Sequence, residues 1–184
     1  MILPVYVYGN PVLRQKAKDI DKSFKDIGIL IENMFETMYK AEGVGLAAPQ
    51  IGQSIRLIVI DTNIMSEDDK SLKDFKKCFI NPKVLEESGE EWIYNEGCLS
   101  LPTFREDVKR KEKIHVQYFD ENFDIHEEWF DGMKARIFQH EYDHLEGIVF
   151  SDRLSAFKRR LIKGKLNDIM RGKIEKKYKM KFIK

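Results

Sequence analysis

A pair of histidines at helical spacing is the feature that most constrains this chain. His140 and His144 are four residues apart in the segment His140-Glu141-Tyr142-Asp143-His144. Residues i and i+4 lie on one face of a helix, so both imidazoles can bind one metal ion, while Glu141 can reach a water molecule on that ion and move its proton. The pattern therefore predicts a helix at the centre of a hydrolytic metal site. The alternative is an ordinary helix that carries two histidines by chance.

Two histidines are too few, because catalytic zinc-type sites use three protein ligands and keep the fourth position for water. A metzincin-type protease would have a third histidine where this chain has Phe150. A thermolysin-like protease would use a downstream acidic residue, and only Asp168 and Glu175 are candidates. Upstream, Cys98 stands in the segment Glu96-Gly97-Cys98-Leu99-Ser100 and completes a Cys/His/His ligand set.

The two cysteines are expected to differ. Cys78 lies in an apolar-flanked run and is interpreted as an inert, buried small residue, whereas Cys98 is interpreted as a metal ligand. If Cys98 were instead a nucleophile, it would need a histidine base. His115 and His126 are the remaining histidines, and their alternating, strand-like segments favour surface or structural roles.

Three motifs together resemble the peptide deformylase family. They occur in the family's order: Gly43-Val44-Gly45-Leu46-Ala47-Ala48-Pro49-Gln50, then Glu96-Gly97-Cys98-Leu99-Ser100, then Gln139-His140-Glu141-Tyr142-Asp143-His144. The flanking sequence from Met1 to about Phe150 is also similar to the family, so the resemblance covers most of the chain. A metalloprotease and a non-catalytic metal- or ribosome-binding protein remain the alternatives.

The resemblance implies removal of the formyl group from N-terminal formylmethionine of nascent peptides, with release of formate. Cys98, His140 and His144 would hold one divalent ion, which lowers the pKa of its water so that hydroxide attacks the formyl carbon. Glu141 would take the proton and pass it to the departing amine. The resemblance implies Fe(2+) as the ion, and the ligand set also suits Zn(2+), Ni(2+) or Co(2+).

The resemblance also assigns residues around the formyl group. The side-chain amide of Gln50 and the backbone N–H of Leu99 would donate hydrogen bonds to the oxyanion. Gly45 would let the substrate lie against the Val44–Gly45 backbone as an added strand. A small-residue turn after the first helix is the structural alternative for this motif.

A pocket for the methionine side chain is expected beside the metal. Met133, Arg136 and Ile137 precede His140 by three to seven residues on the predicted helix. The stem of Arg136 is expected to line the pocket with its guanidinium turned to solvent, although a salt bridge is an equal alternative. Glu96 and Arg110 are expected to form an ion pair behind Cys98. The other predicted substrate-binding residues are Val44, Ile93, Gly97 and Arg105.

Length and composition favour one cytoplasmic domain. A chain of 184 residues is long enough for one well-buried core and short for two, so residues 1–184 are expected to form a single catalytic domain. No apolar run reaches the about 18 residues of a membrane span, and no basic-then-apolar leader is present. Two cysteines with different roles predict no disulfide framework. We expect neither a membrane partner nor a nucleotide cofactor.

Apolar spacing predicts the first elements. A helix is expected after Ser23 as N-cap and before Gly43, with an apolar stripe. Residues 56–61 are expected to form a buried strand, and residues 63–76 an exposed loop that carries little chemistry. The stripe consists of Phe24, Ile27, Ile31, Met34, Phe35 and Met38.

The second half predicts a hairpin that leads into the metal helix. Residues 114–118 and 125–129 alternate on either side of residues 120–122, which favours an antiparallel pair. Asp131 is expected to cap a helix of roughly sixteen residues that ends at Gly147. The expected fold class is α+β, with antiparallel and mixed sheets around the central metal-binding helix and a helix near the C-terminus.

Charge is distributed unevenly. Residues 157–184 contain twelve Lys or Arg and two acidic residues, which gives a net charge of +10. The net charge of the whole chain is +1, so residues 1–156 have a net charge of −9. A helix is expected here, packed through residues that include Ile162, Leu166, Ile169, Met170 and Ile174. A basic face on an acidic body indicates nucleic acid as a partner. The resemblance implies an enzyme that acts on nascent N-termini and would gain from docking near the ribosomal exit, so the segment from Phe157 onward is predicted to bind the ribosome without taking part in catalysis.

Overall fold

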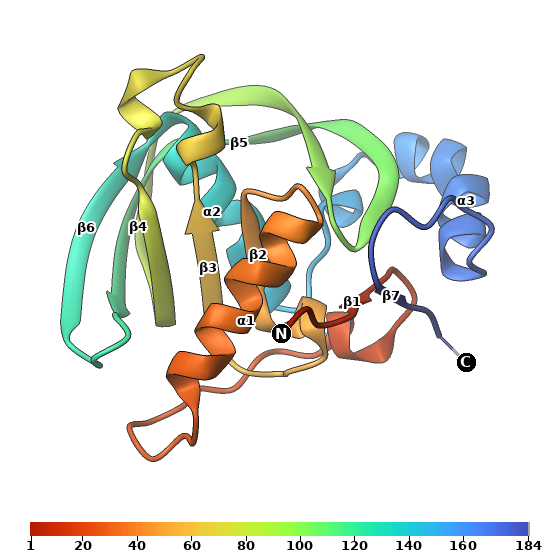
Figure 1. Ribbon diagram of the computed structural model, residues 1–184. Helices are drawn as coiled ribbons and strands as arrows, with labels where there is room; N and C mark the ends of the chain where they lie inside the picture. The colour runs from red at the N-terminus through yellow and green to blue at the C-terminus, as the bar shows by residue number, and fades with distance from the viewer. Residues whose placement is uncertain (184) are drawn as a thin grey trace.

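A five-stranded antiparallel sheet and three helices form the framework of the protein (Figure 1). The computed structural model describes residues 1–183, so the last residue of the predicted basic segment lies outside them. The sheet has the order β2 (Gly45–Ala47), β3 (Leu57–Asp61), β4 (Lys76–Cys98), β5 (Leu101–Phe119) and β6 (Ile125–Asp131). The helices are α1 (Ile27–Lys40), α2 (Gly132–Leu145) and α3 (Ala156–Met170). A small parallel pair joins β1 (Val5–Tyr6) to β7 (Met180–Lys181). These elements confirm the α+β class.

Strand β3 is buried on both faces, as its continuous apolar sequence predicts. Ile58 and Ile60 face one hydrophobic cluster, which includes the aromatic side chains of Phe79 and Phe138 on β4 and α2. Leu57 and Val59 face a second cluster, to which α1 contributes Ile31, Met34 and Met38. Side chains alternate along a strand, so β3 carries a helix on each side. This arrangement seats α2 against the sheet (Figure 1).

The long strands β4 and β5 form one bent antiparallel pair. Register shifts interrupt their pairing at several points, and β-bulges of this kind bend a sheet and increase its twist. The pair ends in the turn between Cys98 and Leu101. At the other end, β5 and β6 pair around residues 120–124, which confirms the predicted hairpin. The sequence of β6 then continues directly into α2.

Helix α2 begins after Asp131, as predicted, but the Asp131 side chain makes no capping hydrogen bond, and the helix is fourteen residues long instead of about sixteen. It ends in a Schellman motif, in which Ile148 N–H donates to Asp143 O at 2.9 Å and Gly147 N–H donates to His144 O at 3.3 Å. Gly147 has φ +72°, and a Cβ there would lie 2.7 Å from Arg14 O. Only glycine fits this close approach without strain.

Helix α1 begins later than the sequence predicts. The hydroxyl of Ser23 donates to Asp21 Oδ1 at 2.5 Å, and the Ser23 N–H donates to the same oxygen at 2.8 Å. This local turn competes with a helix start, so the expectation that Ser23 is the N-cap is wrong. Asp26 precedes the first helical residue instead, and Phe24 lies outside the helix.

The segment from residue 63 to residue 75 is more structured than the expected loop. It contains two short 3-10 turns, Asn63–Met65 and Lys70–Leu72, and it buries Leu72 and Phe75. Thr62 donates its hydroxyl to Leu72 O at 2.6 Å, which holds the two ends of the segment together. No helix in the described part of the chain is long and apolar enough to cross a membrane.

Helix α3 packs through apolar residues at the predicted spacing, but it ends at Met170, so Ile174 lies beyond it and packs on the same hydrophobic cluster as the helix from the following segment. Ile162, Leu166 and Ile169 are buried in a third hydrophobic cluster with Phe104 and Phe150. The hydroxyl of Ser155 accepts a hydrogen bond from Lys158 N–H at 3.2 Å and caps the helix. Beyond α3 the chain turns back, and β7 pairs with β1 on the same side of the molecule as α3 (Figure 1).

We predict that Gly147→Ala lowers the free energy of unfolding by at least about 1–2 kcal/mol, because alanine is strained at positive φ and its Cβ meets the Arg14 backbone. Urea unfolding measures the change. Gly164→Ala is the matched control, since its Cβ would meet no atom within 4 Å and the site lies inside α3. That control should be neutral or stabilising. Equal unfolding midpoints for the two variants would contradict this explanation.

Candidate metal centre and active site

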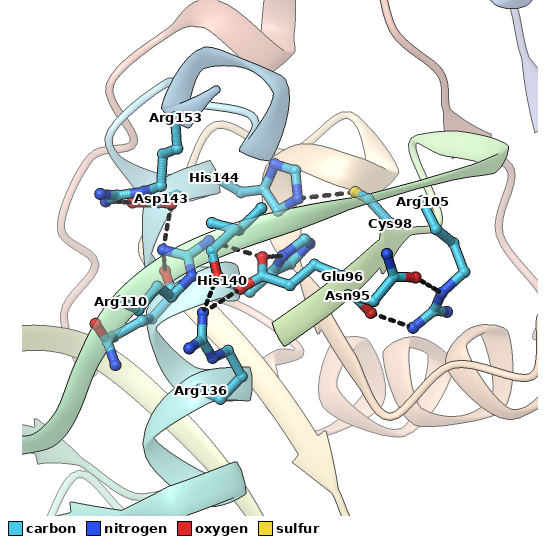
Figure 2. A network of polar contacts seen from close by, with 12 residues as sticks. Asn95, Glu96, Cys98, Arg105, Arg110, Arg136, His140, Asp143, His144 and Arg153 are labelled. Carbon is cyan, nitrogen blue, oxygen red and sulfur yellow. Dashed lines mark hydrogen bonds and ion pairs between the residues drawn. The ribbon is translucent and has the colours of Figure 1, made fainter. Parts of the chain in front are cut away.

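Three predicted ligands meet on one side of α2. The donor atoms of Cys98, His140 and His144 all lie within 4.8 Å of one another. Cys98 Sγ is 3.2 Å from His144 Nε2 (Figure 2). The two histidines come from the last two turns of α2, and the cysteine comes from the end of β4. Cys98 and His140 are 42 residues apart in the sequence, and the fold brings their side chains into one group.

The donor atoms fit a divalent metal ion. In a tetrahedral site with sulfur at about 2.3 Å and nitrogen at about 2.1 Å, those two donors lie roughly 3.5 Å apart. The separation between Cys98 Sγ and His144 Nε2 is close to this value. One thiolate and two imidazoles suit zinc and the other late first-row metals, and three protein ligands leave a position for water.

Glu96 holds His140 in place from behind. One carboxylate oxygen, Oε2, lies 2.8 Å from His140 Nδ1, so Nδ1 carries the proton and Nε2 is left for the metal side (Figure 2). Arg110 donates to both oxygens of Glu96, through Nε at 2.7 Å and Nη2 at 3.0 Å. The expected ion pair of Glu96 and Arg110 is therefore present, and it is almost fully buried.

Arg136 joins the same carboxylate, which corrects one expectation. Its guanidinium is buried, and Nη1 donates to Glu96 Oε1 at 2.9 Å and to Val108 O at 3.1 Å. Nη2 donates to Trp92 O at 2.7 Å, and the guanidinium stacks over the Trp92 ring at 4.3 Å. The expectation that this guanidinium turns to solvent is wrong, and the salt-bridge alternative is confirmed. A buried charge is stable only with such partners.

The buried cluster around Glu96 contains both acidic and basic side chains, which stabilise one another. Burial alone would raise the pKa of Glu96, but hydrogen bonds from His140 and Arg110 outweigh burial and hold this pKa well below its usual range. Asp143 accepts from Arg110 Nη1 at 2.8 Å and also pairs with Arg153. The network thus continues from β4 through β5 and α2 to the turn before α3 (Figure 2).

Glu141 lies at the metal site without a hydrogen-bond partner. Its Oε2 atom is buried and contacts no donor among the described residues. Burial raises the pKa of Glu141 to about 7. A Cβ on Gly45 would lie 2.6 Å from Glu141 Oε1, so the missing side chain of Gly45 makes room for this carboxylate. The structure thus adds a second reason for glycine at this position.

Gln50 is buried beside the ligand cysteine. Its Oε1 accepts from Ala47 N–H at 2.8 Å, which turns the amide NH2 toward Cys98 Sγ at 3.6 Å and Ser100 Oγ at 3.3 Å. Leu99 follows Cys98 in the turn, and its side chain packs against Gly43. Both predicted oxyanion donors therefore belong to residues that border the metal site.

A cavity of about 600 Å³ opens beside the ligands. Ile93 is the one predicted pocket residue outside its lining, with 64% of its surface exposed. Side chains alternate along β4, so the buried Glu96 shares a face with Tyr94, and Tyr94 lines the cavity instead. Counting back by two from Glu96 would have selected it. The predicted substrate-binding residues in the lining are Val44, Gly45, Gly97, Arg105, Met133, Arg136 and Ile137.

Three further lining residues come from segments that were expected to be remote. Met65, in the supposed loop, reaches the cavity, as do Lys177 and Tyr178 of the C-terminal segment. That the segment from residue 157 onward takes no part in catalysis stays a prediction, although two of its residues line the cavity. A truncation after Gly172 would remove both of these lining residues and β7, so it cannot separate ribosome binding from activity.

The remaining cysteine and histidines stand apart from the site. Burial, reinforced by the nearby Glu121 carboxylate, raises the pKa of the Cys78 thiol to about 12, so Cys78 stays protonated and inert at neutral pH. His115 stacks on Trp129, and His126 lies 2.8 Å from Asp120 Oδ2. These contacts are structural, as the sequence predicts.

Comparison with known proteins identifies the family of the chain. A family model described as Polypeptide deformylase matches residues 2–160. The chain belongs to the peptide deformylase family. A peptide deformylase of Christiangramia forsetii is 53% identical over 189 residues, which cover 99% of this chain and 96% of that protein. The crystal structure of a peptide deformylase from Legionella pneumophila is 37% identical with a TM-score of 0.82, and the match covers 96% of this chain and 99% of that chain.

A second solved structure gives the same result. The crystal structure of peptide deformylase from Thermotoga maritima is 39% identical with a TM-score of 0.76, and the match covers 84% of this chain and 99% of that chain. The resemblance found from the three motifs is thus confirmed. The protein is a hydrolase that removes the formyl group from formylmethionyl nascent peptides, and its family is one of metalloenzymes.

We predict that Arg136→Met lowers the free energy of unfolding by about 3 kcal/mol, because the change removes one partner of a buried ion pair and leaves two backbone carbonyls without their donor. Urea unfolding at constant metal loading measures this loss. Arg105→Met, which removes an exposed arginine bonded to Asn95, should cost less than about 1 kcal/mol. Similar losses in the two variants would show that the buried network does not depend on Arg136.

Proposed function

We propose that this deformylase depends on one divalent metal ion held by Cys98, His140 and His144. The observation that carries the proposal is the approach of these three donor atoms to within 4.8 Å of one another, next to Glu141 and at the edge of the cavity. When bound, the ion would act as a Lewis acid and lower the pKa of a water molecule at this site. Fe(2+) is the proposed ion, and Zn(2+), Ni(2+) and Co(2+) suit the same ligands.

Glu141 is the proposed general base and acid. Its buried, unpartnered Oε2 can accept the proton of the attacking water, and its raised pKa lets it return that proton to the departing amine near neutral pH. Gly45 supports this role because only a residue without a side chain leaves the carboxylate its space.

Gln50 and Leu99 are the proposed donors to the formyl oxygen as it gains negative charge. The Gln50 amide is already turned toward the metal side by its bond to Ala47 N–H. It would exchange its contacts with Cys98 and Ser100 for one with the oxyanion. Each donor of this kind contributes about 3 kcal/mol to a transition state.

The substrate is proposed to bind as a strand along β2. This strand lies at the edge of the sheet and pairs only with β3, so its outer edge can accept an extended peptide at Val44 and Gly45. Gly97 lies across the cavity, and Arg105 crosses directly over it, where it can meet the peptide chain. Met133 and Ile137 on α2 offer apolar surface for the methionine side chain.

Residues 1–184 are proposed to act as one catalytic domain in the cytoplasm, docked on the ribosome through the basic segment. Helix α3 supports docking because Arg160, Lys163 and Lys165 are exposed on it, whereas its buried residues Ile162, Leu166 and Ile169 pack on the domain. Exchange of these three for Glu should weaken ribosome co-sedimentation at low salt. A control exchange of the exposed Lys22, Lys25 and Lys40 alters net charge equally. Equal weakening in both would exclude α3 as the docking face.

The direct test is formate release from a short formylmethionyl peptide by anaerobically prepared protein, with metal analysis of the same sample. The proposal expects hydrolysis that scales with metal content and disappears after chelation. A thiolate-bound ferrous centre should also lose activity in air. Activity without any divalent metal, or cleavage of internal peptide bonds in unformylated peptides instead, would contradict it.

We predict that Glu141→Gln retains the metal and loses a factor of about 100 or more in kcat, because glutamine preserves the shape of the side chain and cannot accept a proton. Steady-state formate release and metal content should be measured on the same preparation. Wild-type kcat in this variant would eliminate Glu141 as the base.

We predict that Cys98→Ser and Cys78→Ser differ in metal content. Serine at position 98 replaces a thiolate ligand with a neutral hydroxyl, so the metal affinity should fall strongly. Serine at position 78 replaces a buried thiol outside the site and should leave the metal content unchanged. Metal analysis after dialysis distinguishes the two variants, and an equal loss would refute the assignment of separate roles.

A further inference from the structure

The C-terminal segment returns to the metal site after α3. Gly172 ends the helix with φ +70°, and the chain then runs back to the cavity, where Tyr178 forms part of the wall. The Tyr178 hydroxyl donates to Leu99 O at 2.6 Å. Leu99 lies in the turn between β4 and β5, directly after the ligand Cys98. The last residues of the chain thus contact the turn that carries the metal ligand.

One peptide group links Tyr178 to the ligand sulfur. The carbonyl of this group, Leu99 C=O, accepts from Tyr178, and its N–H, which belongs to Ser100, donates to Cys98 Sγ at 3.4 Å. A peptide group is planar and rigid, so the direction of its carbonyl sets the direction of its N–H. We propose that Tyr178 is a positioning residue that orients the Leu99–Ser100 peptide and, through it, the hydrogen bond to the metal-binding sulfur.

The hydrogen bond to sulfur matters because donors around a thiolate ligand reduce the charge that it gives to the metal. Among the described residues, the Ser100 N–H and the Gln50 amide, at 3.6 Å, are such donors to Cys98 Sγ. The same turn also carries the Leu99 N–H proposed to meet the formyl oxygen. A tilt of the Leu99–Ser100 peptide would therefore weaken the hydrogen bond to the Cys98 sulfur. It would also disturb the turn that presents this oxyanion donor.

The tail holds Tyr178 firmly enough for this role. Two residues after it, β7 pairs with β1, and Val5 N–H donates to Lys179 O at 2.8 Å while Asn10 Nδ2 donates to Lys181 O at 2.9 Å. Met180 and Phe182 pack on the third hydrophobic cluster. The turn is fixed from its other side as well, because Tyr8 N–H donates to Ser100 O at 2.8 Å. Tyr178 therefore lies between an anchored strand and an anchored turn.

The test is Tyr178→Phe in the full chain loaded with Co(2+), which removes only the hydroxyl. We expect the cobalt–thiolate absorption band to shift relative to the wild type. We also expect kcat for a formylmethionyl peptide to fall about fivefold, the factor that corresponds to one neutral hydrogen bond, with KM changed less than about twofold. Tyr39→Phe is the matched control, since it also removes a 2.6 Å hydroxyl bond, to Asp61, away from the metal site.

The proposal rests on the metal-dependent function above, and the two can fail separately. The cobalt band reports on Tyr178 even if the wild-type protein hydrolyses no formyl peptide. An unchanged band and an unchanged kcat in Tyr178→Phe would overturn the proposal. A rise in KM alone, with the band unchanged, would also overturn it, because Tyr178 would then contact only the substrate. A shifted band in Tyr39→Phe would remove the link between the spectrum and Tyr178.

Discussion

The buried carboxylate of Glu96 is the interaction on which the rest of the site depends. A charge in this position is costly unless every oxygen has a partner, and Arg110, Arg136 and His140 supply those partners from β5 and α2. The carboxylate therefore joins β4, β5 and the metal helix through one group. It also fixes the tautomer of His140, so a residue outside the proposed ligand set determines which ring nitrogen is left for a metal ion. Loss of one partner leaves an uncompensated charge in the interior, which makes the network sensitive to single substitutions.

The cavity follows from the meeting of four parts of the chain. The edge strand β2 and the metal helix α2 form two sides, the β4–β5 pair forms a third, and the C-terminal segment closes part of the fourth. Strand β3 holds α2 on one face and α1 on the other, so the helix that carries His140 and His144 rests on a buried apolar surface. Rigid elements on both sides of the ligands keep the donor atoms close before a metal binds. Among the described strands β2 pairs only with β3, and the proposed substrate strand would lie along its other edge.

The grouping of Cys98, His140 and His144 could be predicted from sequence, because helical geometry alone places the two histidines on one face and the motif around Cys98 resembles the family. Features that depend on contacts between residues far apart in the sequence could not be predicted in this way. The guanidinium of Arg136 is buried because Glu96, forty residues away, supplies its charge partner. Tyr94, by contrast, could have been predicted in place of Ile93, because alternation along β4 places it on the same face as the buried Glu96. The contact between Tyr178 and Leu99 spans 79 residues, and the composition of the basic segment gave no sign of it.

The central claim is that Glu96 fixes the tautomer in which His140 would bind a metal ion. The most direct measurement is the tautomer of this histidine in the zinc-loaded protein, read from nitrogen–proton correlation spectra of a sample with ¹⁵N-labelled histidine. We expect a proton on Nδ1 and the metal on Nε2, because Glu96 Oε2 lies 2.8 Å from Nδ1. A His140 ring with its proton on Nε2, or one whose signals do not change when zinc is added, would contradict the account.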